Sequence, residues 1–363
     1  MKKICIITNI PSPYRVDFFN YLIENFKEYN FKIIYSSTAE DDRGWNLDFS
    51  KIKNSDFLKS KSIIIKKKLD NKYIHFGFGV TRCLKKYNPD VIIGCEYNPI
   101  SIIAYTWAKL HKKKYISWSD GTLNSEKHIN KTQRMLRKII CKKSDAFIAS
   151  SSKTKEAQVY YGANKEKIKI SNLTIDINKY IYEKTFFKGN RLLFVGRLSY
   201  TKGIDLLLEA LADIECDYML TIVGDGPDRE NLECMVKDMG ISDKVNFVGS
   251  KSGNELQSIY KDNDIFILPS RCDCYGLVLV EAMCNCMAII SSKFADGSYD
   301  LINENGYIIN PYNKSEFSNT IRNLILNNEK SKIMGLKSFN MVNKLSFKYT
   351  AKEFIEAIKI LEI

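Results

Sequence analysis

The chain has 363 residues, of which 45% are hydrophobic, so it is long enough for two domains and too apolar to be disordered. No apolar run approaches the roughly 20 residues that span a bilayer, and the short apolar stretch after Lys2 and Lys3 lacks a signal-peptide cleavage site. The net charge of +13 is uneven, because residues 1–180 carry 34 Lys and Arg against 17 Asp and Glu, whereas residues 181–363 carry 21 against 25. A basic half of this kind is typical of proteins that meet nucleic acid, an anionic membrane or a phosphorylated substrate.

Strand and helix patterns alternate through the first half of the sequence. We expect buried strands at residues 3–8, 31–36, 90–94, 114–118, 145–149 and 167–171, and helices at 14–26, 79–87, 99–111, 131–141 and 152–160. Residues 50–73 are a lysine-rich excursion with one strand-like piece at 62–65. Residues 172–190 lack a long periodic run, which indicates a linker at 173–190.

A second series of strands and helices begins at residue 191. We expect strands at residues 191–195, 218–223, 244–248, 264–268 and 287–291, with helices that start near Gly203, Asp228, Ser252 and Leu277. Such a series predicts an α/β fold, in which two Rossmann-like, doubly wound parallel-sheet domains face a cleft. The predicted domains are residues 1–172 and 191–345, followed by a C-terminal helix at 346–363.

The first candidate motif follows the strand at 191–195. Gly196 allows a tight turn or the close approach of a ligand, and Arg197 and Lys202 precede the next helix. Parallel sheets bind ligands at this carboxyl edge, and two cations beside a helix N-terminus suit a diphosphate. Taken alone, the two cations are explained equally well as solvated loop charges.

The second candidate motif follows the strand at 264–268. Asp273 and Glu281 are eight residues apart and bracket a turn from strand to helix. The N–H groups of Tyr275, Gly276 and Leu277 would face an anion, while the two carboxylates could accept hydrogen bonds from sugar hydroxyls. An alternative for Glu281 is an ordinary acid in a first helical turn, where acids are favoured.

Together these stretches resemble the signature of family 4 glycosyltransferases, which have two Rossmann domains and are of the GT-B type. That pattern is G-R, then K-G, later G-x-G, then P-S, and E-x7-E running into E-A-M. The chain supplies Gly196-Arg197, Lys202-Gly203, Gly224-Asp225-Gly226-Pro227, Pro269-Ser270 and the pair Asp273 and Glu281. The similarity covers most of the chain and is densest from residue 191 to 310.

The resemblance implies a role for each motif residue. Arg197 and Lys202 would neutralise the donor diphosphate, with the backbone at Gly196, Tyr275, Gly276 and Leu277 around it. Glu281 would bind the ribose, Asp273 would contact the transferred sugar, and the loop at Gly249 would face the base. The family is retaining, so Arg197, Lys202 and Asp273 are the predicted catalytic residues and no protein nucleophile is required. No cofactor is expected, because the UDP- or GDP-linked sugar is a co-substrate.

The sequence also departs from the family pattern. Asp273 stands where the family usually has Glu, and Pro11-Ser12-Pro13 replaces a glycine-rich first loop. A histidine often found in the N-terminal domain has no clear counterpart, and Asp120 lies in that region instead. The resemblance therefore implies an acceptor-binding domain at residues 1–172, with Asp120 and Arg15 on the acceptor side, and a nucleotide-sugar-binding domain at 191–345.

Two other sequence features could indicate a metal. Cys272, Cys274, Cys284 and Cys286 form two C-x-C pairs, but zinc sites more often use longer spacers, so we interpret these residues as small hydrophobic side chains. Residues 262–264 form the D-x-D triplet that binds metal in other transferases, although here it precedes a predicted strand. We predict no metal site.

The prediction from the sequence is a retaining hexosyltransferase that acts on a lipid-linked glycan in the assembly of a surface polysaccharide, such as lipopolysaccharide or capsule. We expect it in the cytoplasm, peripheral at the inner face of an anionic membrane, with no nucleic-acid partner. The basic candidates for that surface include Lys66, Lys67 and Lys68 and the helix that begins at Lys131. One alternative is another enzyme with two Rossmann domains that acts on a nucleotide sugar, such as a 2-epimerase or a phosphorylase. A second is a basic nucleic-acid-binding or scaffold protein without enzyme activity.

Overall fold

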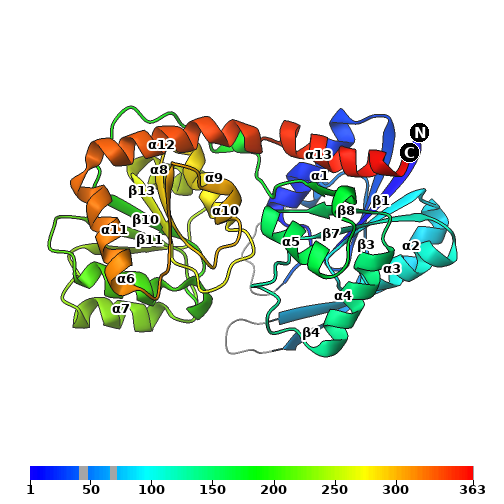
Figure 1. Ribbon diagram of the computed structural model, residues 1–363, viewed down its shortest axis with the longest axis horizontal. Helices are drawn as coiled ribbons and strands as arrows, with labels where there is room; N and C mark the ends of the chain where they lie inside the picture. Colours follow the sequence, from blue (N-terminus) through cyan, green and yellow to red (C-terminus); the bar gives the residue numbers. More distant parts are fainter. Residues whose placement is uncertain (41–47, 66–71, 363) are drawn as a thin grey trace. The chain divides into compact units, whose positions relative to one another are not determined.

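The computed structural model describes residues 1–40, 48–65 and 72–362 (Figure 1). The chain divides into two compact units, one formed by Met1–Asp176 with Phe347–Ile363 and the other by Ile177–Ser346. Each unit is an α/β domain built on a parallel sheet, which confirms the predicted fold class of two Rossmann-like domains. Lys66, Lys67 and Lys68 lie outside the described residues. No helix of the described part of the chain is long and apolar enough to cross a bilayer.

The first unit contains a seven-stranded parallel sheet in the order β3-β2-β1-β6-β7-β8-β9. Its strands are β1 (Lys2–Thr8), β2 (Tyr29–Tyr35), β3 (Ser55–Phe57), β6 (Val91–Cys95), β7 (Lys114–Ser119), β8 (Ala146–Ala149) and β9 (Ile168–Ile170). The helices of this unit are α1 (Pro13–Asn25), α2 (Val80–Tyr87), α3 (Pro99–Leu110), α4 (Lys131–Lys143), α5 (Ser152–Tyr160) and α13 (Phe347–Lys359). The continuous apolar strands agree with burial on both faces, because one core lies under α1 and α13 and another under α2 and α3.

The C-terminal helix α13 belongs to the first unit, where it lies beside α1 (Figure 1). The Phe354 ring lies 5.2 Å from the Trp118 ring and 5.6 Å from the Phe18 ring, measured between centroids. These aromatic contacts bury the apolar side of the helix, which the sequence analysis placed in a segment of its own at 346–363.

A two-stranded antiparallel sheet adds to the first unit, formed by β4 (Lys59–Ile65) and β5 (Lys72–Phe78). The sequence predicted only the strand-like piece at 62–65. The lysines that alternate with serine and isoleucine in this segment weaken the apolar pattern of a strand, so the hairpin was not recognised.

The second unit contains a six-stranded parallel sheet in the order β12-β11-β10-β13-β14-β15. Its strands are β10 (Arg191–Val195), β11 (Met219–Val223), β12 (Val245–Gly249), β13 (Ile265–Leu268), β14 (Ala288–Ser292) and β15 (Gly306–Ile309). Its longer helices are α6 (Ile204–Ala212), α7 (Arg229–Asp238), α8 (Gly253–Asp262), α9 (Leu277–Cys284), α11 (Lys314–Leu326) and α12 (Asn328–Val342). Helices α6, α7 and α11 lie on one side of the sheet, and α8, α9 and α12 lie on the other (Figure 1).

The predicted linker packs largely on the second unit, which begins at Ile177. The Lys184 ammonium lies 3.3 Å from the Asp264 carboxylate, and both side chains are buried. The other Asp264 oxygen accepts hydrogen bonds from the N–H groups of Lys188 and Gly189. Asp264, the last residue of the D-x-D triplet, therefore anchors the linker segment at the amino end of β13.

Candidate functional site

The loops that follow β10 and β11 meet at the carboxyl edge of the second sheet. The Leu198 N–H donates to the Asp225 carbonyl at 2.9 Å. The neighbouring position 224 requires a glycine, because a Cβ atom on Gly224 would lie 1.9 Å from the carbonyl oxygen of Gly196. Gly224, from the predicted G-x-G motif, thus lets the two loop backbones touch.

The loop after β13 packs against the same edge. The Arg271 N–H donates to the Thr201 carbonyl at 2.7 Å. Gly203 has a left-handed φ of 68°, and a Cβ atom there would lie 2.3 Å from the carbonyl oxygen of Pro269. The single helical turn Tyr200–Lys202 is therefore pressed onto the loop that carries Asp273.

Two of the predicted catalytic residues contact each other at this edge. The Lys202 ammonium lies 2.7 Å from the Asp273 carboxylate, and the Tyr275 N–H donates to the other Asp273 oxygen at 3.1 Å. Burial raises the pKa of the Asp273 carboxyl, but Lys202 and the N–H groups of Tyr275 and Gly276 together hold that pKa below its ordinary value. Asp273 is thus ionised at neutral pH.

Helix α9 starts directly beside this ion pair. Gly276 caps its N-terminus with a left-handed φ of 82°, and Leu277 is its first residue. The N–H groups of Tyr275 and Gly276 act on the Asp273 carboxylate, so the anion that they contact in the structure is a side chain of the protein itself. The positive end of the helix and the Lys202 ammonium therefore converge on one point.

Glu281 lies one turn further along α9. Its carboxylate accepts a hydrogen bond from the buried Tyr260 hydroxyl at 2.7 Å. Burial raises the pKa of the Glu281 carboxyl to about 7, and the bond from Tyr260 opposes part of that rise. An acid in an ordinary solvated first turn would not show such a shift, so the structure favours a special environment for Glu281.

The remaining donor-side candidates lie at the same edge of the sheet. Arg197 follows β10 on the loop that leads to Lys202, and its side chain is half-buried. Gly249 ends β12 with a φ of 72°, and its carbonyl accepts from the Gly224 N–H at 2.9 Å. Their roles toward the donor stay predictions.

The sequence analysis missed Arg271, which ties together the two loops that carry the predicted catalytic residues. Its guanidinium makes two bonds to the Asp205 carboxylate at 2.6 and 2.5 Å and donates to the Tyr200 carbonyl at 2.9 Å. The guanidinium carbon also lies 4.0 Å from the centroid of the Tyr200 ring. Arg271 thereby fixes the turn that presents Lys202. Its place two residues before Asp273 was the available signal.

The predicted acceptor-side residues form an ion pair in the first unit. The Arg15 guanidinium lies 2.5 Å from one Asp120 oxygen, and the Ser150 hydroxyl donates to the other. The Arg15 guanidinium carbon lies 4.4 Å from the centroid of the Trp118 ring. Arg15 comes from α1 and Asp120 from the end of β7, so the carboxyl edge of this sheet also gathers charged groups.

A second carboxylate that the sequence analysis missed supports the Asp120 loop. Glu96 follows β6 with a left-handed φ of 59° and accepts hydrogen bonds from the Asp120 N–H at 2.5 Å and the Ser119 hydroxyl at 3.2 Å. Burial and the negative charge of Asp120 raise the pKa of Glu96 to about 7. Such backbone strain is uncommon outside turns and functional sites, and its presence beside a buried acid was not visible in the sequence.

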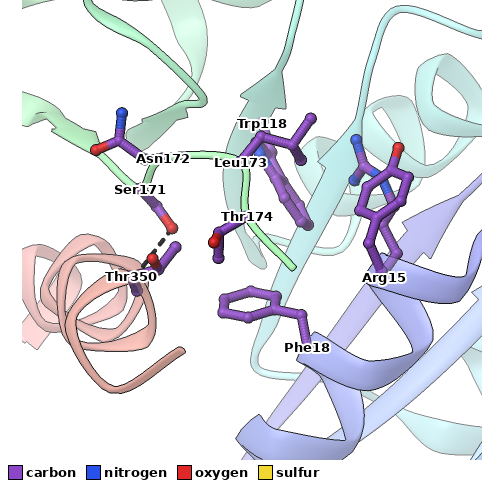
Figure 2. A pocket seen from close by; sticks show the side chains of 9 residues that line it. Arg15, Phe18, Trp118, Ser171, Asn172, Leu173, Thr174 and Thr350 are labelled. Carbon is purple, nitrogen blue, oxygen red and sulfur yellow. Dashed lines mark hydrogen bonds between the residues drawn. The ribbon is translucent and has the colours of Figure 1, made fainter. Parts of the chain in front are cut away.

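A small pocket opens beside Arg15, and Figure 2 shows the side chains that line it. Phe18 and Trp118 supply aromatic walls, while the Ser171 hydroxyl donates to the Thr350 carbonyl at 3.0 Å on one side of the pocket. Its volume of about 10 Å³ is room for about one water molecule. As it stands, the pocket is too small for a sugar.

Within residues 1–40, 48–65 and 72–362, no group of three or more His, Cys, Asp or Glu side chains is arranged to hold a metal ion. Cys284 and Cys286 are buried, whereas Cys272 and Cys274 are half-buried. The four cysteines of the two C-x-C pairs form no such group in this part of the chain.

Comparison with known proteins adds a family match. Residues 182–341 match the family model described as glycosyl transferases group 1. A relative from Campylobacter jejuni, named GalNAc-alpha-(1->4)-GalNAc-alpha-(1->3)-diNAcBac-PP-undecaprenol alpha-1,4-N-acetyl-D-galactosaminyltransferase, is 29% identical over 234 residues, which is 63% of this chain and 62% of the relative. The chain spans between 28% and 62% of the length of the first curated relatives that it matches.

Two solved structures show the same fold over nearly their whole length. The lipopolysaccharide outer core galactosyltransferase WaaB, in its apo form, superimposes with a TM-score of 0.72 at 20% identity, covering 98% of this chain and 99% of WaaB. Anabaena Alr3699/HepE in complex with UDP superimposes with a TM-score of 0.79 at 16% identity, covering 99% of this chain and 100% of HepE. The chain therefore has the GT-B fold, and its residues 182–341 are similar to group 1 glycosyltransferases.

Proposed function

We propose that the protein is a retaining glycosyltransferase that moves a hexose or related sugar from a UDP- or GDP-linked donor to a lipid-linked glycan in the assembly of a surface polysaccharide. The observation that carries the proposal is the convergence of Lys202 and the start of α9 on the Asp273 carboxylate. This point lies at the carboxyl edge of a parallel sheet, where α/β folds bind nucleotides, and inside the segment that matches the family model.

The proposed reaction needs a stabilised leaving group. Negative charge builds on the donor diphosphate as the bond between the sugar and the phosphate oxygen breaks, and preorganised cations and N–H groups lower the energy of that state. Lys202 is held beforehand by its turn and by Asp273, so it reorganises little during the reaction. Arg197, on the same loop, supplies the second cation in this proposal.

The position of Asp273 suits the sugar side of the same bond. Because its carboxylate lies 2.7 Å from the Lys202 ammonium, a diphosphate bound at Lys202 would bring the attached sugar next to Asp273. The acceptor hydroxyl attacks from the face that the phosphate leaves, and the leaving phosphate oxygen takes the hydroxyl proton. Configuration is then retained without a protein nucleophile, while Glu281 accepts hydrogen bonds from the ribose.

The names of the similar proteins support the donor and acceptor classes that we propose. The Campylobacter relative is named for a glycan carried on undecaprenol diphosphate, and WaaB is named for the lipopolysaccharide outer core. HepE was solved with UDP, and another of its structures contains UDP-glucose. A lipid-linked acceptor and a uridine nucleotide are therefore the first combination to test.

The outward side of α4 supports the membrane part of the proposal. The helix carries no acidic residue, and its exposed cations are Lys131, Arg134, Lys138, Lys142 and Lys143. Met135 and Ile139 lie among them and are 56% and 40% exposed. A basic helix with exposed apolar side chains is typical of surfaces that meet anionic lipid.

The test is a thermal-shift screen of the purified protein against nucleotide sugars, followed by transfer assays with lipid-linked acceptors. We expect one donor to raise the melting temperature and free nucleoside diphosphate to appear only when acceptor is present. Lys202→Ala and Arg197→Ala should each lower turnover by roughly 10²- to 10³-fold, as for a lost oxyanion donor, while Lys237→Ala on the exposed side of α7 should not. Near-normal turnover in both site variants, or product formation without acceptor, would contradict the proposal.

A further inference from the structure

The β4–β5 hairpin is attached to the first unit by a well-satisfied inner face. The Ser62 hydroxyl and the buried His75 ring form a hydrogen bond of 2.7 Å, and the other ring nitrogen lies 2.9 Å from the Glu40 carboxylate. Gly77 lets the strand approach closely, because a Cβ atom there would lie 2.8 Å from the Leu58 side chain. His75 and Gly77 therefore hold one end of the hairpin on the first unit, whereas Ile64, on the same face but nearer the turn, is 44% exposed. The opposite face is presented outward.

That outer face combines large apolar side chains with lysines. Phe76 pairs across the strands with Lys61, and Phe78 pairs with Lys59. Phe76 is 39% exposed, Phe78 is 58% exposed and Ile63, further along the same face, is 52% exposed. Neighbouring exposed side chains of this size on a small sheet mark an interaction surface rather than ordinary scatter.

The charge of the hairpin identifies its partner. Neither described strand, at residues 59–65 and 72–78, contains Asp or Glu, so every charged group on the outer face is a cation. Two copies of the chain packed face to face would bring Lys59 and Lys61 against the lysines of the other copy, which is unfavourable. Anionic phospholipid instead pairs with the ammonium groups, and its acyl region accepts the phenylalanine rings.

We propose that the outer face of the β4–β5 hairpin docks onto an anionic lipid surface, with Phe76 and Phe78 entering the boundary between headgroups and acyl chains. The lysines then lie at headgroup level. This inference rests on the proposed function in one respect, namely that the enzyme works next to a membrane that carries its acceptor. It adds a specific inserting element to the general attraction that α4 provides.

The experiment measures co-sedimentation of the full chain with vesicles of phosphatidylcholine alone or mixed with phosphatidylglycerol. Phe76→Ser/Phe78→Ser should weaken binding to the mixed vesicles by roughly tenfold or more, since each ring loses a large part of its apolar burial. The matched control is Phe186→Ser/Leu326→Ser in the second unit, where the side chains are 70% and 68% exposed, and it should bind like wild type. Lys59→Gln/Lys61→Gln should reduce the salt dependence of binding.

A second readout does not depend on removing apolar surface. The tryptophan fluorescence of Phe78→Trp, after subtraction of the wild-type signal, should shift to shorter wavelength when the mixed vesicles are added. Vesicles of phosphatidylcholine alone should cause no shift. Transfer activity is measured on the same samples as the release of nucleoside diphosphate in the presence of a water-soluble acceptor. This activity does not depend on vesicle binding, so it should be unchanged in the hairpin variants.

The outcomes separate the two proposals. Wild-type binding that persists unchanged in Phe76→Ser/Phe78→Ser would overturn the hairpin inference and leave α4 as the membrane element. Failure of the wild type to prefer the mixed vesicles would overturn the hairpin inference together with the membrane part of the proposed function, while transfer activity would still test the enzyme. A hairpin-dependent dimer in light scattering, without vesicle binding, would assign the face to a second copy instead.

Discussion

Replacing Glu281 by glutamine tests the environment of the candidate ribose ligand without removing its shape. The Tyr260 hydroxyl can donate to the amide oxygen as it does to the carboxylate, so packing should be retained. The change removes a carboxyl group whose pKa burial raises from an ordinary 4.5 to about 7. Each pKa unit corresponds to about 1.4 kcal/mol, and after a discount for solvent screening we expect about 2 kcal/mol in the free energy of unfolding.

The sign of the effect follows from proton binding. Between pH 4.5 and 7 the folded chain holds a proton on Glu281 that the unfolded chain has released, so the free energy of unfolding falls as the pH rises through this window. Below pH 4.5 the contribution of this carboxyl is fully present. Above pH 7 it is lost, because the folded state must then accommodate a buried charge.

Urea denaturation at pH 5 and pH 8 measures this difference. Glu281→Gln should be more stable than the wild type by about 2 kcal/mol at pH 8 and by only about 0.5 kcal/mol at pH 5. The control is Glu230→Gln, an exposed acid on α7, which should follow the wild type at both pH values. If the free energies of unfolding of the wild type and Glu281→Gln differ by the same amount at both pH values, the reasoning is refuted. Donor affinity should nevertheless fall in Glu281→Gln, because an ionised acceptor for the ribose hydroxyls is lost.

Three further substitutions probe the ion pairs of the two units. Asp273→Asn frees Lys202 from its carboxylate, so free nucleoside diphosphate should bind up to about tenfold more tightly in calorimetry while turnover falls. Arg271→Lys cannot make both bonds to its partner carboxylate, so kcat should fall more than donor affinity, with about 1–2 kcal/mol of stability lost in urea. Asp120→Asn removes the counter-charge of buried Arg15 and should lower the free energy of unfolding by about 2–3 kcal/mol, measured the same way.

The parallel sheets were predictable because their strands are nearly continuous apolar runs. The expected strands at 191–195 and 264–268 correspond closely to β10 and β13, and the expected helix starts lie within one residue of those observed. Burial on both faces produces such runs, and the regular spacing of strand and helix then fixes a parallel arrangement. Strand β15 was missed, since it follows a polar loop and opens on a glycine, which weakens the strand pattern.

The candidate site was predictable only where single residue types report local geometry. Gly224 and Gly203 entered the prediction as members of the family motifs, and in the structure each of them allows two backbones to touch. Arg271 was missed because its partners, such as the carboxylate of Asp205, lie 66 positions away in the chain. Glu96 was missed for the same reason, because its environment depends on Asp120 on the neighbouring strand. Such contacts form between side chains that only folding brings together at the edge of a sheet. A local sequence pattern therefore does not reveal them.

The distribution of charge shows why the proposed donor site would have to be built from local groups. Residues 181–363 carry more acidic than basic side chains, so the second half offers no general attraction to a diphosphate. In the proposed function, Lys202 and the first N–H groups of α9 would attract the diphosphate from inside this acidic half. Salt screens such short-range, fixed groups less than it screens exposed charges. The cations of α4 have the opposite character, because they are exposed, numerous and act at longer range. In the proposed function the chain binds two anions, a donor diphosphate and an anionic lipid surface. The first needs fixed local charges and the second needs many exposed ones, and the two halves of the sequence supply them separately.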